Sequence, residues 1–140
     1  MAAFAAERES LVAHARRMAD DGLTDGMSGN LSIRLPDMIG ITPSGVPYDA
    51  MTPSDICLVS LGTRPATAGR RRPSTETPMH LAVYNAFGPA AGAVVHTHSP
   101  YVVALSATCD VLPAVHYAMA GLGGPVRVTP YARFGTAELA

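Results

Sequence analysis

The chain has 140 residues, 48% of them hydrophobic and 15% charged, which is typical of a single globular domain over residues 1–140 and excludes a disordered protein. The formal net charge of −1 argues against a broad nucleic-acid-binding surface. Because no apolar run approaches the roughly 20 residues of a membrane span, we expect a soluble cytoplasmic protein.

The first predicted element is a helix over residues 4–21, in which Leu11 and Met18 lie on one apolar face. Charged residues at positions 7–9 interrupt any apolar signal-peptide core. We therefore expect this helix to pack on the domain core, with His14 on its exposed side.

A turn-rich loop at residues 25–30 leads into a strand whose alternation places Leu31, Ile33 and Leu35 on one face. Glycines in such a loop let backbone N–H groups approach an anion, and Asn30 adds a side-chain amide. A phosphate-binding loop is one interpretation. An ordinary connection between a helix and a strand is the other, and the residues alone favour it.

A second strand is predicted at residues 38–42, antiparallel to the first. The loop that follows, at 43–47, repeats the anion-binding chemistry with Ser44 and Gly45. Three further elements are predicted before the next helix: a capped helical turn at 52–55, an apolar strand at 56–61 and a loop at 62–73.

Ser74 and Thr75 are N-cap candidates for a helix that ends at Gly88, which places Glu76 in its first turn. An acidic side chain there is stabilised by the helix dipole and needs no function. The N–H groups of the same turn are nevertheless a potential phosphate site, and Glu76 would be able to reach a metal ion beside them.

An apolar run over residues 93–98 predicts a buried strand with two histidines at its end, His96 and His98. Side chains two positions apart on a strand share a face, so we expect the imidazoles roughly 7 Å apart. A catalytic zinc usually has three protein ligands, of which this pair would supply two. Two hydrogen-bonded, partly exposed rings are the alternative on spacing alone.

The rest of the chain predicts a helix at 100–107, an apolar segment at 111–117 and a short strand at 126–128. Residues 135–140 resemble the N-cap and first turn of a helix. Because a single turn is costly to nucleate, we expect that the chain is a truncated one. Cys57 and Cys109 lack the spacing of a metal site and are expected to be free thiols.

Six motifs in register resemble the zinc-dependent class II aldolase and adducin family, and look closest to its fuculose-phosphate branch. They are Gly26-Met27-Ser28-Gly29-Asn30, Thr42-Pro43-Ser44-Gly45-Val46-Pro47-Tyr48, Pro73-Ser74-Thr75-Glu76, His96-Thr97-His98, His116-Tyr117 and Pro130-Tyr131-Ala132-Arg133-Phe134-Gly135-Thr136. The resemblance spans nearly the whole chain. It implies an α/β fold with a mostly antiparallel central sheet flanked by helices, assembled as a homotetramer with active sites between subunits.

The resemblance also implies roles for individual residues. The positions that match the substrate phosphate site are Asn30, Ser44, Gly45, Ser74 and Thr75. Glu76 matches the acid/base residue that can also approach zinc, and His96 and His98 match two zinc ligands. Tyr117 matches a tyrosine that donates a proton across the subunit interface.

The implied reaction is the Zn²⁺-dependent cleavage of a ketose phosphate, such as L-fuculose 1-phosphate, into dihydroxyacetone phosphate and an aldehyde such as lactaldehyde. Related epimerases, dehydratases and decarboxylases use the same platform, and a non-catalytic adducin-like module is a further alternative. The sequence departs from the family in two places. Met27 stands where the branch usually has Thr, and the third zinc histidine of the family would lie beyond position 140.

Overall fold

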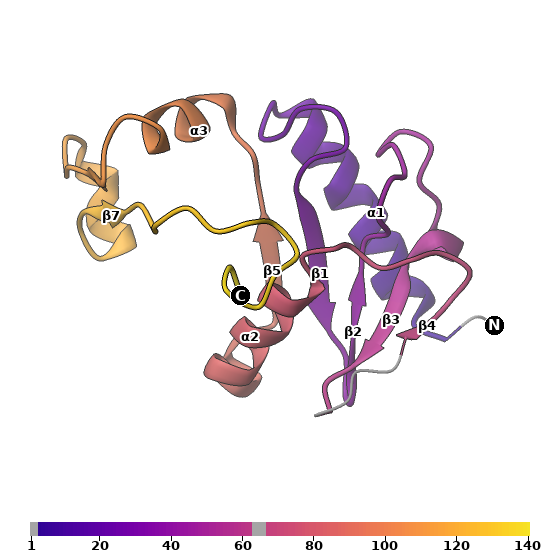
Figure 1. Ribbon diagram of the computed structural model, residues 1–140. Coiled ribbons are helices and arrows are strands. Elements are labelled where there is room, and N and C mark those ends of the chain that lie inside the picture. The colour runs from indigo at the N-terminus through magenta and orange to yellow at the C-terminus, as the bar shows by residue number, and fades with distance from the viewer. Residues whose placement is uncertain (1–2, 63–66) are drawn as a thin grey trace.

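The computed structural model describes residues 3–62 and 67–140. An antiparallel five-stranded sheet, in the order β4-β3-β2-β1-β5, lies between helix α1 on one face and helix α2 on the other (Figure 1). This arrangement confirms the expected α/β class with helices flanking an antiparallel sheet. The elements are α1 (Ala5–Asp20), β1 (Asn30–Arg34), β2 (Met38–Ile41), β3 (Cys57–Ser60), β4 (Thr67–Ala68), α2 (Thr77–Phe87) and β5 (Ala93–His96).

Helix α1 covers its face of the sheet with the predicted apolar stripe. Leu11, Ala15 and Met18 are buried in one cluster with Leu31 of β1 and Ile56. Burial of each large apolar side chain contributes about 1.5–3 kcal/mol relative to an exposed one. The helix therefore anchors β1, the strand from which the candidate site begins.

The opposite face combines an apolar cluster with buried polar groups. Tyr84 of α2 packs with Ile39 and Val59 in a second core cluster. His80, one helical turn earlier, is 0% exposed and lies against Ser32 of β1. Buried polar groups need hydrogen-bond partners, so this face carries an ordered polar network as well as apolar packing.

Helix α2 starts later than predicted, because Ser74 forms a turn of its own ahead of it. The Ser74 hydroxyl accepts a hydrogen bond from the backbone N–H of Glu76 at 3.2 Å, and its carbonyl accepts one from Thr77 Oγ at 2.6 Å. Glu76 consequently occupies the N-cap position instead of the first turn. The end of the helix at Gly88 is confirmed.

The prediction of a buried strand over residues 93–98 was wrong in two respects. Strand β5 ends at His96, and its residues alternate between exposed and half-buried, with Val95 58% exposed. β5 is the edge of the sheet: it pairs with β1 on one side, and no strand of the described residues pairs with its other side. An apolar run alone does not distinguish a central strand from an edge strand.

The predictions for the short elements agree with the structure in some places and not in others. The capped turn, η1 (Pro53–Asp55), is confirmed. Strand β4 lies inside the predicted loop 62–73, of which residues 63–66 fall outside the described residues. Residues 135–140 form turns in which Thr136 Oγ1 accepts from the backbone N–H of Leu139 at 3.4 Å and Thr136 O accepts from that of Ala140 at 3.3 Å, as expected for an N-cap and one helical turn.

After β5 the chain runs beside the sheet and returns to the start of α2 (Figure 1). The elements of this excursion are α3 (Pro100–Ser106), β6 (Val111–Leu112), η3 (Tyr117–Leu122) and β7 (Val126–Arg127). Among the described residues, no helix has both the length and the apolar character needed to cross a bilayer.

Candidate functional site

A cavity of about 180 Å³ lies where three loops meet at the start of β1. Its lining includes all five residues predicted to bind phosphate: Asn30, Ser44, Gly45, Ser74 and Thr75. Glu76, His98 and Phe134 complete one side of it. The fold thus brings together residues that lie in five separate stretches of the sequence.

Hydrogen bonds fix the three loops relative to one another. The single hydrogen of Tyr48 Oη is shared between the carbonyls of Ser28 and Gly29, at O···O distances of 2.8 and 2.7 Å, which holds the first loop. The backbone N–H of Ser74 donates to the carbonyl of Thr42 at 3.1 Å, which joins the second and third loops. The loops that line the cavity are therefore held in place by hydrogen bonds within the chain.

Gly29 lies too close to the end of β5 to carry a side chain. Its φ is +77°, and a Cβ there would come within 2.7 Å of the carbonyl oxygen of His96. Both the left-handed backbone and the close contact require glycine. This approach places the first loop directly against the end of β5, at His96.

His96 and His98 lie with their ring centroids 4.8 Å apart and their planes at 51°. The rings are closer than the roughly 7 Å expected for an extended strand, because β5 ends at His96 and the backbone N–H of His98 turns to donate to Leu23 O at 3.0 Å. Burial lowers the pKa of His96, the neighbouring His98 lowers it further, and Glu76 opposes both effects. A neutral imidazole is the form that binds metal.

Glu76 is only 6% exposed, and its Oε1 accepts a hydrogen bond from the backbone N–H of Gly135 at 2.7 Å. Across residues 3–62 and 67–140, no three His, Cys, Asp or Glu side chains converge closely enough to hold a metal ion. Glu76 therefore does not complete a three-residue cluster with the two imidazoles here, and its role as a ligand stays a prediction.

Behind the cavity, Asn30 connects the histidine pair to the buried face of α2. Its Oδ1 lies 2.6 Å from His80 Nε2 and 3.3 Å from His96 Nδ1. Ser32 Oγ lies 2.6 Å from His80 Nδ1 and 2.8 Å from Tyr84 Oη. Burial, together with the charge of His96, lowers the pKa of His80 to about 4, so this imidazole is neutral near pH 7.

These contacts add Ser32, His80 and Tyr84, none of which was predicted from the sequence to belong to the site. A signal was available, because Glu76, His80 and Tyr84 are spaced by four residues and such spacing places side chains on one helical face. What the spacing does not reveal is the strand against which that face packs.

Tyr117 is not brought to this cavity. It lies at the start of η3, is 86% exposed and stacks on His116 with ring centroids 4.4 Å apart. Within one chain, therefore, the structure does not combine Tyr117 with Glu76.

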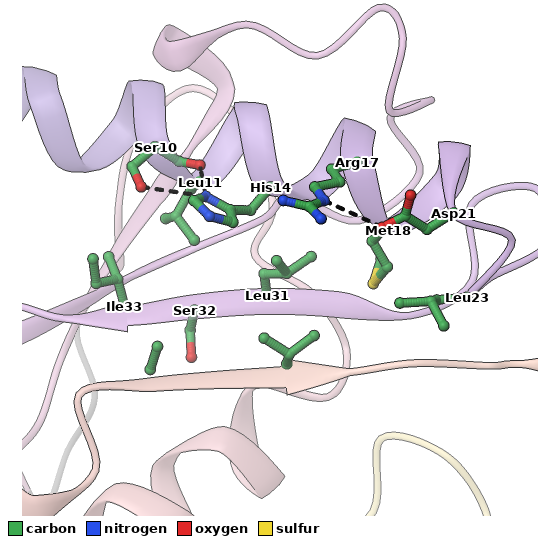
Figure 2. A pocket seen from close by; sticks show the side chains of 12 residues that line it. Ser10, Leu11, His14, Arg17, Met18, Asp21, Leu23, Leu31, Ser32 and Ile33 are labelled. Atoms are coloured by element: carbon green, nitrogen blue, oxygen red, sulfur yellow. Dashed lines mark hydrogen bonds and ion pairs between the residues drawn. The ribbon is translucent and has the colours of Figure 1, made fainter.

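A larger cavity of about 310 Å³ lies between α1 and strands β1 and β5, on the other face of the sheet (Figure 2). Leu11, Leu31 and Ile33 project into it. The polar groups at its rim are paired with one another: Arg17 with Asp21 at 3.2 Å, and His14 Nδ1 with Ser10 O at 2.8 Å. This mostly aliphatic lining provides no catalytic chemistry, so the smaller polar cavity is the candidate site.

Comparison with known proteins points to one family. Residues 9–140 match the model of the class II aldolase and adducin N-terminal domain. The chain is 41% identical over 136 residues to 5-deoxy-D-ribulose 1-phosphate aldolase of Bacillus thuringiensis, covering 96% of this chain and 63% of that protein. It is also 41% identical to L-fuculose phosphate aldolase of Escherichia coli K12 over 119 residues, covering 84% of this chain and 54% of that protein.

Comparison with solved structures leads to the same group of proteins. An L-fuculose 1-phosphate aldolase superposes with a TM-score of 0.87 at 33% identity, covering 99% of this chain and 65% of that one. A putative aldolase/epimerase/decarboxylase from Klebsiella pneumoniae gives a TM-score of 0.79 at 30% identity, covering 96% and 66%. The chain thus spans a little over half to two thirds of the length of these relatives.

Proposed function

Because the chain belongs to the class II aldolase and adducin family, we propose that it acts in the metal-dependent cleavage of a ketose 1-phosphate. The products would be dihydroxyacetone phosphate and an aldehyde, lactaldehyde if the substrate is L-fuculose 1-phosphate. The observation that carries this proposal is the cavity that combines five phosphate-binding candidates with Glu76 and His98. We further propose a cytoplasmic homotetramer.

The relatives limit the choice of substrate. They are named for fuculose phosphate and for 5-deoxyribulose 1-phosphate, both phosphorylated ketoses. In our proposal the phosphoryl end binds in the cavity through the N–H and hydroxyl groups of its loops. The oxygen of Asn30 is already occupied by two imidazoles, so its NH₂ group is the donor that it offers to the phosphate. These remote contacts orient the bond that breaks.

The residues present fit a divalent ion in part. His96 and His98 are neighbouring imidazoles, which are common zinc ligands, and we propose that they hold the ion. The described residues do not place a third His, Cys, Asp or Glu close enough to complete the site. Such an ion would supply Lewis-acid stabilisation of the negative charge that develops on the substrate oxygens.

The proton transfers are assigned to two side chains. In the cleavage direction, the C4 hydroxyl gives its proton to the phenolate of Tyr117 of a neighbouring subunit as the C3–C4 bond breaks, and becomes the aldehyde. In the reverse direction the Tyr117 phenol donates this proton to the aldehyde oxygen. The bonding electron pair stays on the dihydroxyacetone phosphate fragment as an enediolate. Glu76, which must carry a proton at this point, delivers it to C3, and transfer of a proton from the Tyr117 phenol to the Glu76 carboxylate through solvent restores both groups, so atoms and charge balance. Each such general acid–base step contributes about 10²–10⁴-fold.

A direct assay tests this function. The chain is loaded with zinc and incubated with L-fuculose 1-phosphate or 5-deoxyribulose 1-phosphate, and dihydroxyacetone phosphate is measured by its enzymatic reduction with NADH. We expect product from at least one ketose, and loss of both bound zinc and product in His96→Ala. His14→Ala, which alters an exposed histidine of α1, is the matched control. Stoichiometric zinc in His96→Ala would remove His96 from the ligand set.

One observation favours a second candidate, a non-catalytic module on the same fold. The described residues do not form a metal site with three ligands. If this chain is such a module, it will bind inorganic phosphate in the cavity but release no aldehyde from either ketose at any zinc concentration.

A further inference from the structure

A continuous chain of hydrogen bonds runs from the core of the protein to the proposed metal site. It contains Tyr84, Ser32, His80, Asn30 and His96, with successive contacts of 2.8, 2.6, 2.6 and 3.3 Å. The first four of these residues are at most 6% exposed. No buried side-chain nitrogen or oxygen of the described residues lacks a partner. The hydrogens in this chain must therefore be arranged consistently.

Tyr84 sets the direction of donation along this chain of hydrogen bonds. Burial raises the pKa of its phenol, so the phenol keeps its proton, and Ser32 Oγ at 2.8 Å is the acceptor for it. Ser32 then uses its own hydrogen to donate to His80 Nδ1. The placement of Asn30 gives the same direction, because its Oδ1 faces His80 Nε2 and a carbonyl oxygen only accepts, which leaves Nδ1 of the neutral ring to accept from Ser32.

His80 accepts a hydrogen bond from Ser32 and donates one to Asn30. Its imidazole is buried and neutral, and because Nδ1 accepts from Ser32, the single ring hydrogen lies on Nε2. Nε2–H donates to Asn30 Oδ1 at 2.6 Å, which fixes the carboxamide with its oxygen toward both imidazoles. A carbonyl oxygen only accepts, so the ring nitrogen of His96 that faces it must be the protonated one.

We propose that His80 is a positioning residue for His96: acting through Asn30, it places the hydrogen of His96 on Nδ1 and leaves Nε2 as the nitrogen that binds the metal ion. The choice of tautomer does not depend on the proposed function; its use in metal binding does. A metal-binding histidine generally donates its other N–H to such an acceptor, and loss of that support costs 10–100-fold in affinity. Here the acceptor is itself held in place by a second histidine.

The tautomer is measured directly in the metal-free chain. Histidine is labelled with ¹⁵N, and long-range ¹H–¹⁵N spectra are recorded at about pH 8, above the ordinary histidine pKa of about 6.5. We expect His96 to carry its hydrogen on Nδ1 and His80 to carry its hydrogen on Nε2. A wild-type spectrum with the His96 hydrogen on Nε2 would overturn the proposal without any variant.

Two substitutions separate the hydrogen bond from the shape of the side chain. His80→Phe keeps a ring but has no donor for Asn30, so we expect a mixture of His96 tautomers and zinc affinity reduced at least 10-fold, measured against a chromophoric chelator. His80→Gln restores an N–H donor and should keep zinc affinity within about threefold of the wild type. An unchanged His96 tautomer in folded His80→Phe would contradict the proposal.

Val59→Ala controls for a merely structural effect, because Val59 belongs to the same core cluster as Tyr84 but lies outside the hydrogen-bonded chain. It should lower stability and leave the His96 tautomer unchanged; an equal change of tautomer would contradict the proposal. If the tautomers are as expected but the wild type binds no zinc, the positioning role of His80 stands and the proposed function fails.

Discussion

The backbone N–H of Gly135 donates a hydrogen bond to Oε1 of Glu76 at 2.7 Å, across 59 positions of sequence. This bond holds the returning end of the chain against the loop that precedes α2, with Phe134 in the wall of the cavity. One carboxylate oxygen of Glu76 is thereby fixed next to the phosphate-binding candidates. The position suits a group that moves a proton on a bound phosphorylated substrate.

Glu76→Gln tests that role while keeping the contact, because an amide oxygen can still accept from Gly135. The amide cannot carry the transferred proton. We expect exchange of the C3 proton of dihydroxyacetone phosphate with D₂O, followed by NMR, to slow by about 10²–10⁴-fold. Binding of inorganic phosphate, measured by calorimetry, should not change. Exchange at the wild-type rate would exclude Glu76 as the base.

Gly29 and Gly26 provide a matched pair for the approach of the first loop to β5. Both have positive φ, +77° and +58°, but a Cβ at Gly29 would lie 2.7 Å from His96 O, whereas nothing lies within 4 Å of one at Gly26. Gly26→Ala should cost about 1 kcal/mol of unfolding free energy from backbone strain alone. Gly29→Ala should cost about 1–3 kcal/mol more, because backbone must move. Urea unfolding measures both, and equal losses would show that the contact is not restrictive.

The local chemistry of the site could be predicted from the sequence. Glycine, serine and threonine in three loops are compatible with anion binding, which the family resemblance favours over ordinary connections, and His96-Thr97-His98 places two imidazoles close together through the chain alone. These features depend on neighbours in sequence, so folding changes them little. The capped turn at η1 is of the same kind.

What the sequence did not reveal depends on which elements meet. Ser32 and His80 are 48 positions apart and bond only because α2 packs on the face of β1 that Ser32 occupies. The edge position of β5 likewise depends on the order of strands and not on its apolar residues. Single-sequence patterns carry no information on such pairings.

The lowered pKa of the Asp55 carboxyl predicts that the free energy of unfolding depends on pH. Hydrogen bonds from Thr52 and from the Arg71 guanidinium hold the pKa of this carboxyl at about 2, below its ordinary 3.8. Because the folded pKa is the lower one, the stabilisation is fully present above about pH 4 and is lost as the pH falls through 2. Because the Arg71 side chain of this pair is 53% exposed, solvent screening limits this stabilisation to about 1 kcal/mol, and we expect Asp55→Asn to lack it. Urea unfolding at pH 5 and pH 2.5 tests this, and parallel pH slopes for the two proteins would contradict it.

A mixing experiment tests whether active sites are shared between subunits. Tyr117 is 86% exposed and lies outside the cavity that Glu76 lines, so the two can meet only if another copy of the chain supplies Tyr117. Glu76→Gln and Tyr117→Phe should each be nearly inactive alone. After unfolding and refolding together in equal amounts, about one site in four should combine an intact Glu76 with an intact Tyr117 from its neighbour, because subunits of a closed homo-oligomer assemble at random. Recovery of about a quarter of wild-type activity would support sharing, since two variants of a protein with separate sites cannot complement each other. No recovery from a mixture shown by mass measurement to contain mixed oligomers would exclude Tyr117 from the partner's site.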